Sequence, residues 1–310
     1  MQRPPFAALT LGLFAAASTL AADASAADVA GFALDRFEPA ERGSEWFAED
    51  SLDLRGHLRP AVGVTGDWGY GPLVVHEASG AEKLPLVDHQ LFVHLGAAMN
   101  LWDRVRVAMN VPVAVFERGA DASVNGSVYG APSGAAAGDV RLAADVRLFG
   151  AYRAPIEGAL GVRVWLPSGS RAGYASDGMT RFGMHLSVAG ELEGAFVYAA
   201  HVGFDDRPED ATFDAVQLGS TLDFGASAGV RALDGRLVVG PEFWGSSLVQ
   251  HGEAFTKLAT PIEALLGAHM SFGDVRVGAG FGAGLSEGLG APRLRGLVSV
   301  EWAPAVRSDP

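Results

Sequence analysis

A fifteen-residue run from Arg104 to Arg118 limits the possible fold more than any other stretch. Successive side chains of a β-strand point to opposite faces, so alternate residues of such a run share a face. One alternate set is wholly apolar and consists of Val105, Val107, Met109, Val111, Val113 and Val115. About ten residues cross a bilayer as a tilted strand, whereas soluble strands are usually about 5–6 residues long. The run therefore predicts a lipid-facing strand of a closed barrel.

The composition agrees with a barrel that encloses a polar interior. Of 310 residues, 19% are charged and 49% hydrophobic, which is too polar for a bundle of transmembrane helices. The net charge of −13 argues against a nucleic-acid partner, because phosphates require basic patches. The chain has no cysteine, which excludes disulfides, thiolate metal sites, a thiol nucleophile and a lipidated cysteine anchor. We expect no cofactor.

The first 26 residues have the pattern of a cleaved export signal. Arg3 precedes an uncharged apolar stretch at 6–20, and Ala24-Ser25-Ala26 fits a small-residue cleavage site. We expect the mature chain to start near Ala27, with cleavage after Ala21 as the alternative. No later stretch offers 18 uncharged apolar residues, so membrane crossing would have to use barrel strands.

Alternating runs continue along the chain and predict an all-β, antiparallel transmembrane barrel at 55–303, followed by a periplasmic tail at 304–310. We expect about fourteen strands, within a range of 12–14, with a turn at 66–71. An even number places both chain ends on the side of the short turns. The runs are 32–38, 58–65, 72–76, 86–100, 104–116, 139–148, 158–166, 182–188, 196–204, 222–231, 237–248, 262–272, 275–285 and 294–302.

Two alternatives remain for the N-terminal segment at 27–54, which mixes aromatic and acidic residues. It contributes a first strand at 32–38, or it folds into the lumen as a plug. A further small hairpin is expected at Asn125-Gly126, because this dipeptide favours a two-residue hairpin turn inside the long loop at 117–137.

The predicted connections alternate between short turns and long polar loops, as in outer-membrane barrels. Aromatic residues cluster near the short turns and predict an interfacial girdle. Its members are Trp102, Phe149, Tyr152, Phe196, Phe272 and Trp302. A secreted β-sandwich, the main alternative fold, predicts neither feature. The pattern therefore indicates the bacterial outer membrane, with its lipid as the chief partner.

Charged residues and histidines occupy the opposite, inward row of the predicted strands. They line an aqueous pore for small solutes, or they pair and plug a narrow barrel; we favour the pore. The residues are Arg106, Arg141, Asp145, Arg147, Arg163, His185, Asp223, Arg231, Glu263, His269, Arg276 and Arg295.

Three motifs suggest other chemistry but fit it poorly. The G-x-S-x-G pattern at 225–229 lies inside an alternating strand, whereas a serine nucleophile needs a strand–turn–helix context. The glycine-rich run at 278–284 lacks the spacing and the lysine of a phosphate loop. The acidic loop at 205–210 does not have the spacing of an EF-hand. We expect no catalytic residue and no metal site, and hence no enzyme.

The chain resembles the N-terminal barrel of OmpA-like outer-membrane proteins. The resemblance rests on the export signal, on Phe37-Glu-Pro-Ala-Glu-Arg-Gly-Ser-Glu-Trp-Phe47, on Gly56-His-Leu-Arg-Pro60 and on the hairpin at Leu101-Trp-Asp103. Those proteins commonly continue into a peptidoglycan-binding domain, for which we expect no counterpart here. The pattern also resembles barrels associated with uptake of aromatic or hydrophobic compounds. We expect a passive channel for small solutes; the alternative is a structural outer-membrane protein with a closed or plugged lumen.

Overall fold

The computed structural model describes residues 31–76, 82–124, 127–132, 134–208, 211–213, 216–250 and 254–306. The predicted signal peptide at 1–26 and its cleavage site lie outside these residues. The described residues include no helix long and apolar enough to cross a membrane.

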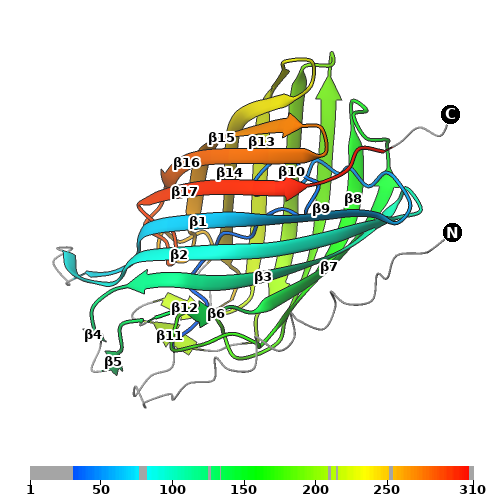
Figure 1. Cartoon of the computed structure of the whole chain (residues 1–310). Helices are drawn as coiled ribbons and strands as arrows, with labels where there is room; N and C mark the ends of the chain where they lie inside the picture. Colours follow the sequence, from blue (N-terminus) through cyan, green and yellow to red (C-terminus); the bar gives the residue numbers. More distant parts are fainter. Residues whose placement is uncertain are drawn as a thin grey trace, which may run out of the picture.

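Twelve antiparallel strands form a closed barrel (Figure 1). The first strand pairs with both the second and the last, so the ring of strands is closed. The strands are β1 (Arg59–His76), β2 (Glu82–Leu101), β3 (Val105–Arg118), β7 (Val140–Phe149), β8 (Glu157–Leu166), β9 (Arg181–Leu192), β10 (Phe196–Asp206), β13 (Thr221–Ala232), β14 (Leu237–Leu248), β15 (Ile262–Phe272), β16 (Val275–Gly284) and β17 (Leu294–Trp302).

Short strands outside the ring lie in two of the long loops. A two-residue strand, β6 (Ala136–Ala137), adds to β3. The hairpin of β4 (Ala122–Val124) and β5 (Ser127–Tyr129) confirms the one predicted around Asn125-Gly126, although that dipeptide itself is outside the described residues. A second hairpin, β11 (Ala211–Phe213) with β12 (Val216–Leu218), lies in the loop after β10.

The barrel has two strands fewer than the fourteen expected, at the lower limit of the predicted range of 12–14. The turn expected at 66–71 does not exist, because β1 runs through it and merges the strands predicted at 58–65 and 72–76. Its pairing with β2 shifts register after Tyr70, and bulges of this kind bend a strand without ending it. The stretch at 32–38 forms no strand.

The alternation along β3 is confirmed. Val107 and Met109 on its outer row are 44% and 43% exposed, whereas Arg106 and Asn110 on its inner row are 1% and 3% exposed. The alternation slips once, after Ala114, where the pairing with β2 contains a bulge. An apolar outer row beside a polar inner row is the arrangement of a barrel in lipid.

Short turns and long loops lie at opposite ends of the barrel, as predicted. The β2–β3 turn is among the tightest, with Trp102 and Asp103 both at positive φ, +54° and +56°. Two consecutive positive φ values define the hairpin turn whose twist matches that of the flanking strands.

Residues 31–58, here called the lumen segment, cross the inside of the barrel; in Figure 1 this part of the chain is blue. At the long-loop end, the backbone N–H of Leu34 donates to the carbonyl of Tyr174 (3.0 Å). At the short-turn end, the N–H of Gly56 donates to Asp103 (2.7 Å). Residue 31 therefore lies at the opposite end of the barrel from residue 303. The N-terminal end of the chain, which we expected on the short-turn side, lies outside the described residues.

The lumen segment packs its apolar side chains against small residues of the wall. Trp46, Leu52 and Leu54 form one buried cluster with wall residues of which several are alanines. Glycines of the wall provide further room: a Cβ on Gly229 would lie 2.9 Å from the Trp46 ring and 2.3 Å from a wall carbonyl. Glycines of the inner wall thus make space for the segment.

Candidate functional site

The inner wall and the lumen segment carry complementary charges. The twelve inward residues singled out from the sequence include seven arginines and only three acids. The lumen segment has seven acids, Asp35, Glu38, Glu41, Glu45, Glu49, Asp50 and Asp53, against three arginines. Most of the pairs described below join one to the other.

Arg106 of β3 connects the segment to the wall near its middle. Its guanidinium pairs with Asp145 of β7 (2.8 Å) and with Asp50 of the segment. His185 of β9 contacts the other oxygen of Asp145 (3.2 Å). Arg106, Asp145 and His185 are all buried. A buried guanidinium is tolerated only when several acceptors satisfy it, as they do here.

Arg141 of β7 binds the segment nearer the long loops. It pairs with Glu38 (2.8 Å) and Glu41 (2.9 Å), and it donates to the carbonyl of Pro39 (2.7 Å). The indole N–H of Trp165 donates to the second oxygen of Glu38 (2.9 Å). These contacts fix the start of the segment's descent through the barrel.

Arg231 of β13 holds the segment near the short turns. It forms a two-pronged pair with Glu45 (2.6 and 2.7 Å) and also pairs with Glu191 of β9 (3.0 Å). Bidentate guanidinium–carboxylate pairs combine strength with a fixed orientation. Tyr152 donates its hydroxyl to the same Glu45 (3.0 Å).

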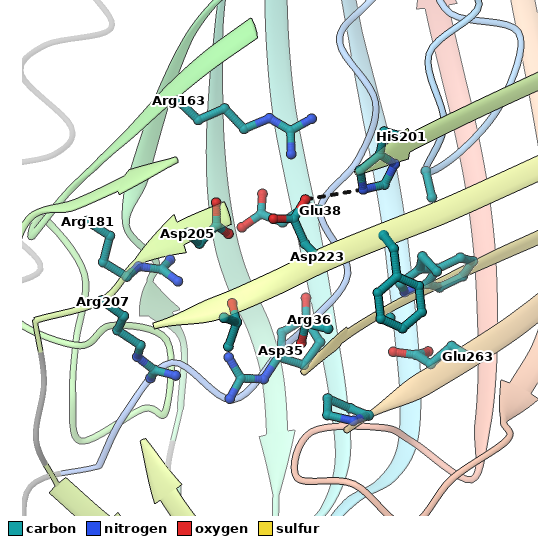
Figure 2. A pocket seen from close by; sticks show the side chains of 17 residues that line it. Asp35, Arg36, Glu38, Arg163, Arg181, His201, Asp205, Arg207, Asp223 and Glu263 are labelled. Carbon is teal, nitrogen blue, oxygen red and sulfur yellow. Dashed lines mark ion pairs between the residues drawn. The ribbon is translucent and has the colours of Figure 1, made fainter. Parts of the chain in front are cut away.

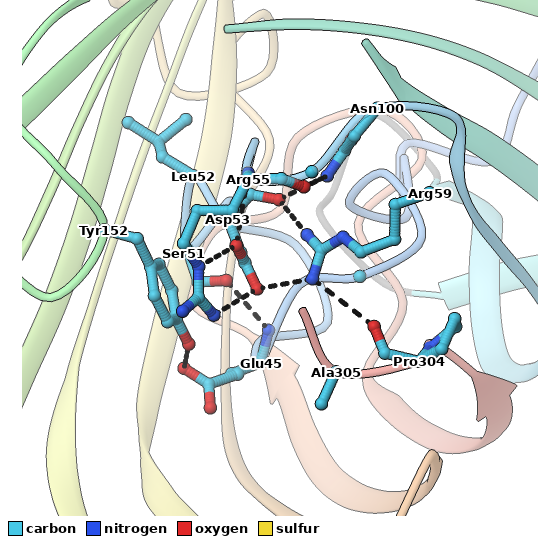
Figure 3. Close-up of polar contacts among 12 residues, drawn as sticks. Glu45, Ser51, Leu52, Asp53, Arg55, Arg59, Asn100, Tyr152, Pro304 and Ala305 are labelled. Carbon is cyan, nitrogen blue, oxygen red and sulfur yellow. Dashed lines mark hydrogen bonds and ion pairs between the residues drawn. The ribbon is translucent and has the colours of Figure 1, made fainter. Parts of the chain in front are cut away.

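The end of the lumen segment is held by a further polar cluster, shown in Figure 3. Asp53 pairs with Arg55 (2.8 Å) and with Arg59 (3.0 Å), the first residue of β1. The side-chain amide of Asn100, on β2, donates to the backbone carbonyls of Asp53 (2.7 Å) and Arg55 (3.1 Å). This cluster joins the end of the segment to the first two strands.

The backbone of the segment is also held by wall side chains. Glu242 of β14, which is fully buried, accepts the N–H groups of Phe47 and Ala48 at 2.9 Å. Arg276 of β16 donates to the carbonyl of Gly43 (3.2 Å) and pairs with Glu301 (3.0 Å). The segment forms no strand, so side chains replace the usual ladder partners of its backbone.

The remaining predicted inward residues also face the interior. Arg147 donates to the carbonyl of Leu52 (3.3 Å), and Arg295 pairs with Glu263 (2.6 Å). The ring of His269 packs against that of Phe47, with the centroids 4.3 Å apart and the two planes tilted by 52°.

Five of the six predicted girdle residues are exposed on the outside: Trp102, Phe149, Phe196, Phe272 and Trp302, at 43–67%. The assignment of Tyr152 to the girdle is wrong. Its hydroxyl reaches inward to Glu45, and Arg55 lies over its ring at 4.1 Å. Burial and the neighbouring Glu45 carboxylate raise the pKa of Tyr152. A tyrosine can bury its ring while its hydroxyl finds a polar partner.

A small polar cavity remains between the segment and the wall at the long-loop end (Figure 2). Its volume is about 90 Å³, the space of a few water molecules. Arg163 points into it and makes neither a hydrogen bond nor an ion pair with any described residue. Across the cavity, His201 pairs with Asp223 (3.3 Å) and with Glu49 (2.9 Å). The lumen is thus nearly filled in this conformation.

Asp177, in the loop before β9, holds the entry of the lumen segment. It accepts the N–H of Ala33 (2.8 Å) and pairs with Arg207 and with Arg181 (3.3 Å). Burial alone would raise the pKa of Asp177, but Arg207 and Arg181 outweigh it and hold the pKa below the ordinary value.

We expect Asp177→Asn to lower the free energy of unfolding at pH 7 by about 3 kcal/mol, because the buried Arg207 and the half-buried Arg181 both lose an ion-pair partner. A lowered folded-state pKa contributes stability above the unfolded value of about 3.9 and loses it as the pH falls further. The difference in unfolding free energy between the variant and the unaltered protein should therefore shrink below about pH 4. Urea unfolding in detergent at several pH values measures it; a deficit independent of pH would contradict the ionic role.

A larger groove lies at the same end, on the outside of the long loops. Its volume is about 750 Å³, within the range of small-molecule sites. Its lining is mixed and comes from β1, loop 285–293 and two other loops. Apolar side chains lie beside polar ones such as Lys257, Glu287 and Arg293; the apolar ones include Leu73, Val74, Phe213, Leu258, Leu285 and Leu289. β1 runs past Tyr70, where its pairing with β17 ends. The wall therefore has an unpaired strand edge beside the groove.

The floor of the groove joins an apolar cluster beneath the loops. Leu73 and Phe213 belong to both, and Phe32 and Leu34 of the lumen segment pack into the same cluster. The exposed ion pair of Lys257 with Glu287 (2.6 Å) connects two of the loops at the rim. A buried apolar cluster thus connects the floor of the groove with the beginning of the segment.

The structure adds inward residues that are absent from the predicted set. Four of them lie on inward rows and contact other charged or polar groups: Glu191, Glu242, Asp67 and His94. The excess of arginine among the chosen wall residues, beside an acidic segment at 31–58, was the available signal.

No protein-family model and no curated protein matches the sequence. Solved structures do match. One is an outer-membrane channel from Pseudomonas putida F1, with a TM-score of 0.59 and 12% identity over 80% of this chain and 96% of that one. Another is the NanC porin, with a TM-score of 0.51 and 7% identity over 79% of this chain and 100% of that one. The fold is that of bacterial outer-membrane β-barrels, and it places the chain in the outer membrane.

Proposed function

We propose that this protein is an outer-membrane channel that takes up small apolar solutes. The groove of about 750 Å³ beside the unpaired edge of β1 is the observation that carries the proposal. Its size suits an aromatic or aliphatic small molecule, and apolar pockets bind such solutes by removing their surface from water. The fold shared with an outer-membrane channel supports the same class. The proposal includes no catalytic step.

Because the lumen segment fills the barrel, transport requires a change in the lumen. A cavity of about 90 Å³ is too small for such a solute, so passage requires the lumen segment to move. Phe32 and Leu34, which pack into the cluster under the groove, are the part of the segment nearest to a bound solute. Binding there competes with their packing, which gives the solute a physical means of loosening the plug.

Narrowing the groove tests the proposal. We expect Leu258→Trp to weaken binding of naphthalene, used as an apolar probe, about tenfold or more, because the indole fills the space that the probe needs. The control is Leu266→Trp, on the outer face of β15, where the side chain is 62% exposed. Equilibrium dialysis of the detergent-solubilised protein measures binding, and uptake of radiolabelled naphthalene by cells measures transport. Equal loss in both variants, or no binding by the unaltered protein, would contradict the groove.

A structural outer-membrane protein with a plugged lumen is the second candidate. The observation that favours it is the density of buried ion pairs between segment and wall, such as Arg231–Glu45 (2.6 Å). On this view the segment stiffens the barrel and never leaves. The OmpA-like resemblance of the sequence points the same way, but it rests on pattern alone. The two candidate functions differ in solute uptake. A channel takes up solute, and its uptake depends on movement of the lumen segment, whereas a structural protein with a permanent plug takes up none.

A further inference from the structure

We propose that Asp35, Asp67 and His94 form a binding site for a divalent transition-metal ion, which fastens the lumen segment to the wall. Asp35 belongs to the segment, Asp67 to β1 and His94 to β2. The site is independent of the outer groove and of the transport proposal.

The geometry brings three ligand atoms around one point. The Nε2 atom of His94 lies 3.9 Å from Oδ2 of Asp35 and 4.0 Å from Oδ2 of Asp67. Ligand atoms of the three residues all lie within 4.8 Å of one another. Metal–nitrogen and metal–oxygen bonds are about 2.0–2.2 Å long, so an ion between these atoms reaches all three after a small closure.

One atom directed at this point has no partner: Nε2 of His94 is buried and makes no hydrogen bond with any described residue. Asp67 faces it through Oδ2, which Arg295 also contacts, while its second oxygen, Oδ1, is buried and makes no hydrogen bond with any described residue. The two side chains are only 4% and 1% exposed. Buried polar atoms are rarely left unsatisfied, and an ion is one of the groups that satisfies them.

The charge of the cluster favours a cation. Asp35, Asp67 and Glu263 all contact the same guanidinium, that of Arg295, which is 1% exposed. Among the described residues, no other cation is in direct contact with these three carboxylates. A divalent ion would balance the excess of two negative charges. Asp35 keeps its Oδ2 and Asp67 its Oδ1 free of Arg295, so an ion and the guanidinium can share the carboxylates.

A second residue can orient the histidine for this role. The side-chain amide of Asn110 lies 3.3 Å from Nδ1 of His94, and its own Oδ1 is unpartnered. It is the amide nitrogen Nδ2 of Asn110 that faces Nδ1 in this structure; a half-turn of the amide group would bring Oδ1 there instead, so that Asn110 accepts the Nδ1 proton and leaves the Nε2 lone pair free for an ion. Metal-binding histidines almost always donate their other ring N–H in this way.

The donor set defines the class of ion. One imidazole and two carboxylates, with water completing the coordination, suit zinc, manganese or iron in the divalent state better than calcium, which prefers oxygen ligands alone. No cysteine competes for the ion anywhere in the chain.

Zinc content after refolding tests the site. The full mature chain is refolded in detergent with zinc sulfate, dialysed against metal-free buffer and measured by atomic emission. We expect the unaltered protein to retain one more zinc ion per chain than His94→Gln or Asp35→Asn. In competition with a chelator, each variant should bind zinc at least about tenfold more weakly. Asp35 belongs to the lumen segment and not to the barrel wall, so Asp35→Asn should leave the barrel folded. It therefore tests the site even if His94→Gln fails to fold.

His89→Gln is the matched control, because His89 lies on the same strand as His94 but contacts Asp88 (3.6 Å) instead of the site. It should retain the zinc of the unaltered protein. Heat-modifiable migration in gels shows that each variant has formed a barrel. If the folded unaltered protein keeps no zinc, or if both site variants keep as much as it does, the proposal is overturned.

Discussion

Deletion of residues 31–54 is expected to turn a closed barrel into an open pore. Side chains alone fill an eight-stranded barrel, whereas larger barrels leave space that something else must occupy. In this twelve-stranded barrel the lumen segment occupies it and leaves a cavity of about 90 Å³. Without the segment, water and ions gain a path lined by arginines such as Arg106 and Arg231. In planar bilayers we expect conductance to rise about tenfold or more over the unaltered protein.

The wall should survive the deletion, since its twelve strands close through their own ladder. Resistance to heat-induced unfolding in gels tests that point. A matched control removes the charge partners but keeps the chain: Glu45→Gln together with Asp50→Asn should loosen the segment and give intermittent openings. A deletion variant that folds but conducts no more than the parent would show that the segment does not close the lumen.

Arg106→Ala is expected to cost about 3–5 kcal/mol of unfolding free energy, the largest effect of any single substitution proposed for stability. The guanidinium is buried, and its loss leaves Asp145 with only His185, and Asp50 with no counter-charge, in contact among the described residues. A buried charge without its partner is strongly destabilising, whereas replacing the whole pair by apolar groups is often neutral. Urea unfolding of the barrel in detergent micelles measures the change.

The matched control for Arg106→Ala is Arg104→Ala, two residues earlier on the same chain. Arg104 is exposed and donates only to a backbone carbonyl, so its loss should cost about 0.5 kcal/mol or less. Adding Asp145→Asn and Asp50→Asn to Arg106→Ala should recover much of the lost stability. If Arg104→Ala and Arg106→Ala cost the same, the charge network does not hold the segment in place.

The wall of the barrel could be predicted from the sequence because lipid enforces a strict rule. Every outward residue of a strand such as β3 must be apolar, so the two-residue period stands out. For the same reason, the predicted first and last residues of β14, β15 and β17 agree with the structure to within a residue. β1 was split in two because Gly66 and Gly69 interrupt its alternation, and local pattern cannot show that β2 pairs with it throughout.

The interior could not be predicted to the same extent, because no periodicity governs a segment without regular structure. The side chains of the lumen segment are placed by partners more than a hundred residues away, as with Glu45 and Arg231. The alternating pattern predicts the inward arginines, but it does not show whether they face water in a pore or pair with the acidic residues of a plug. Tyr152 was misplaced for a related reason: an aromatic ring near a short turn suits the membrane interface, and only its distant partner Glu45 draws it inward.

The accessibility of Ser44 to a water-soluble maleimide tests the central claim most directly. The chain has no cysteine, so Ser44→Cys introduces a single thiol in the middle of the lumen segment, where the side chain is 5% exposed. Ala195→Cys, in an exposed short turn, is the control. We expect the folded barrel to protect Cys at 44 about a hundredfold relative to 195, and urea to abolish the difference. Equal labelling of both positions in the folded barrel would contradict a lumen filled by its own N-terminal segment.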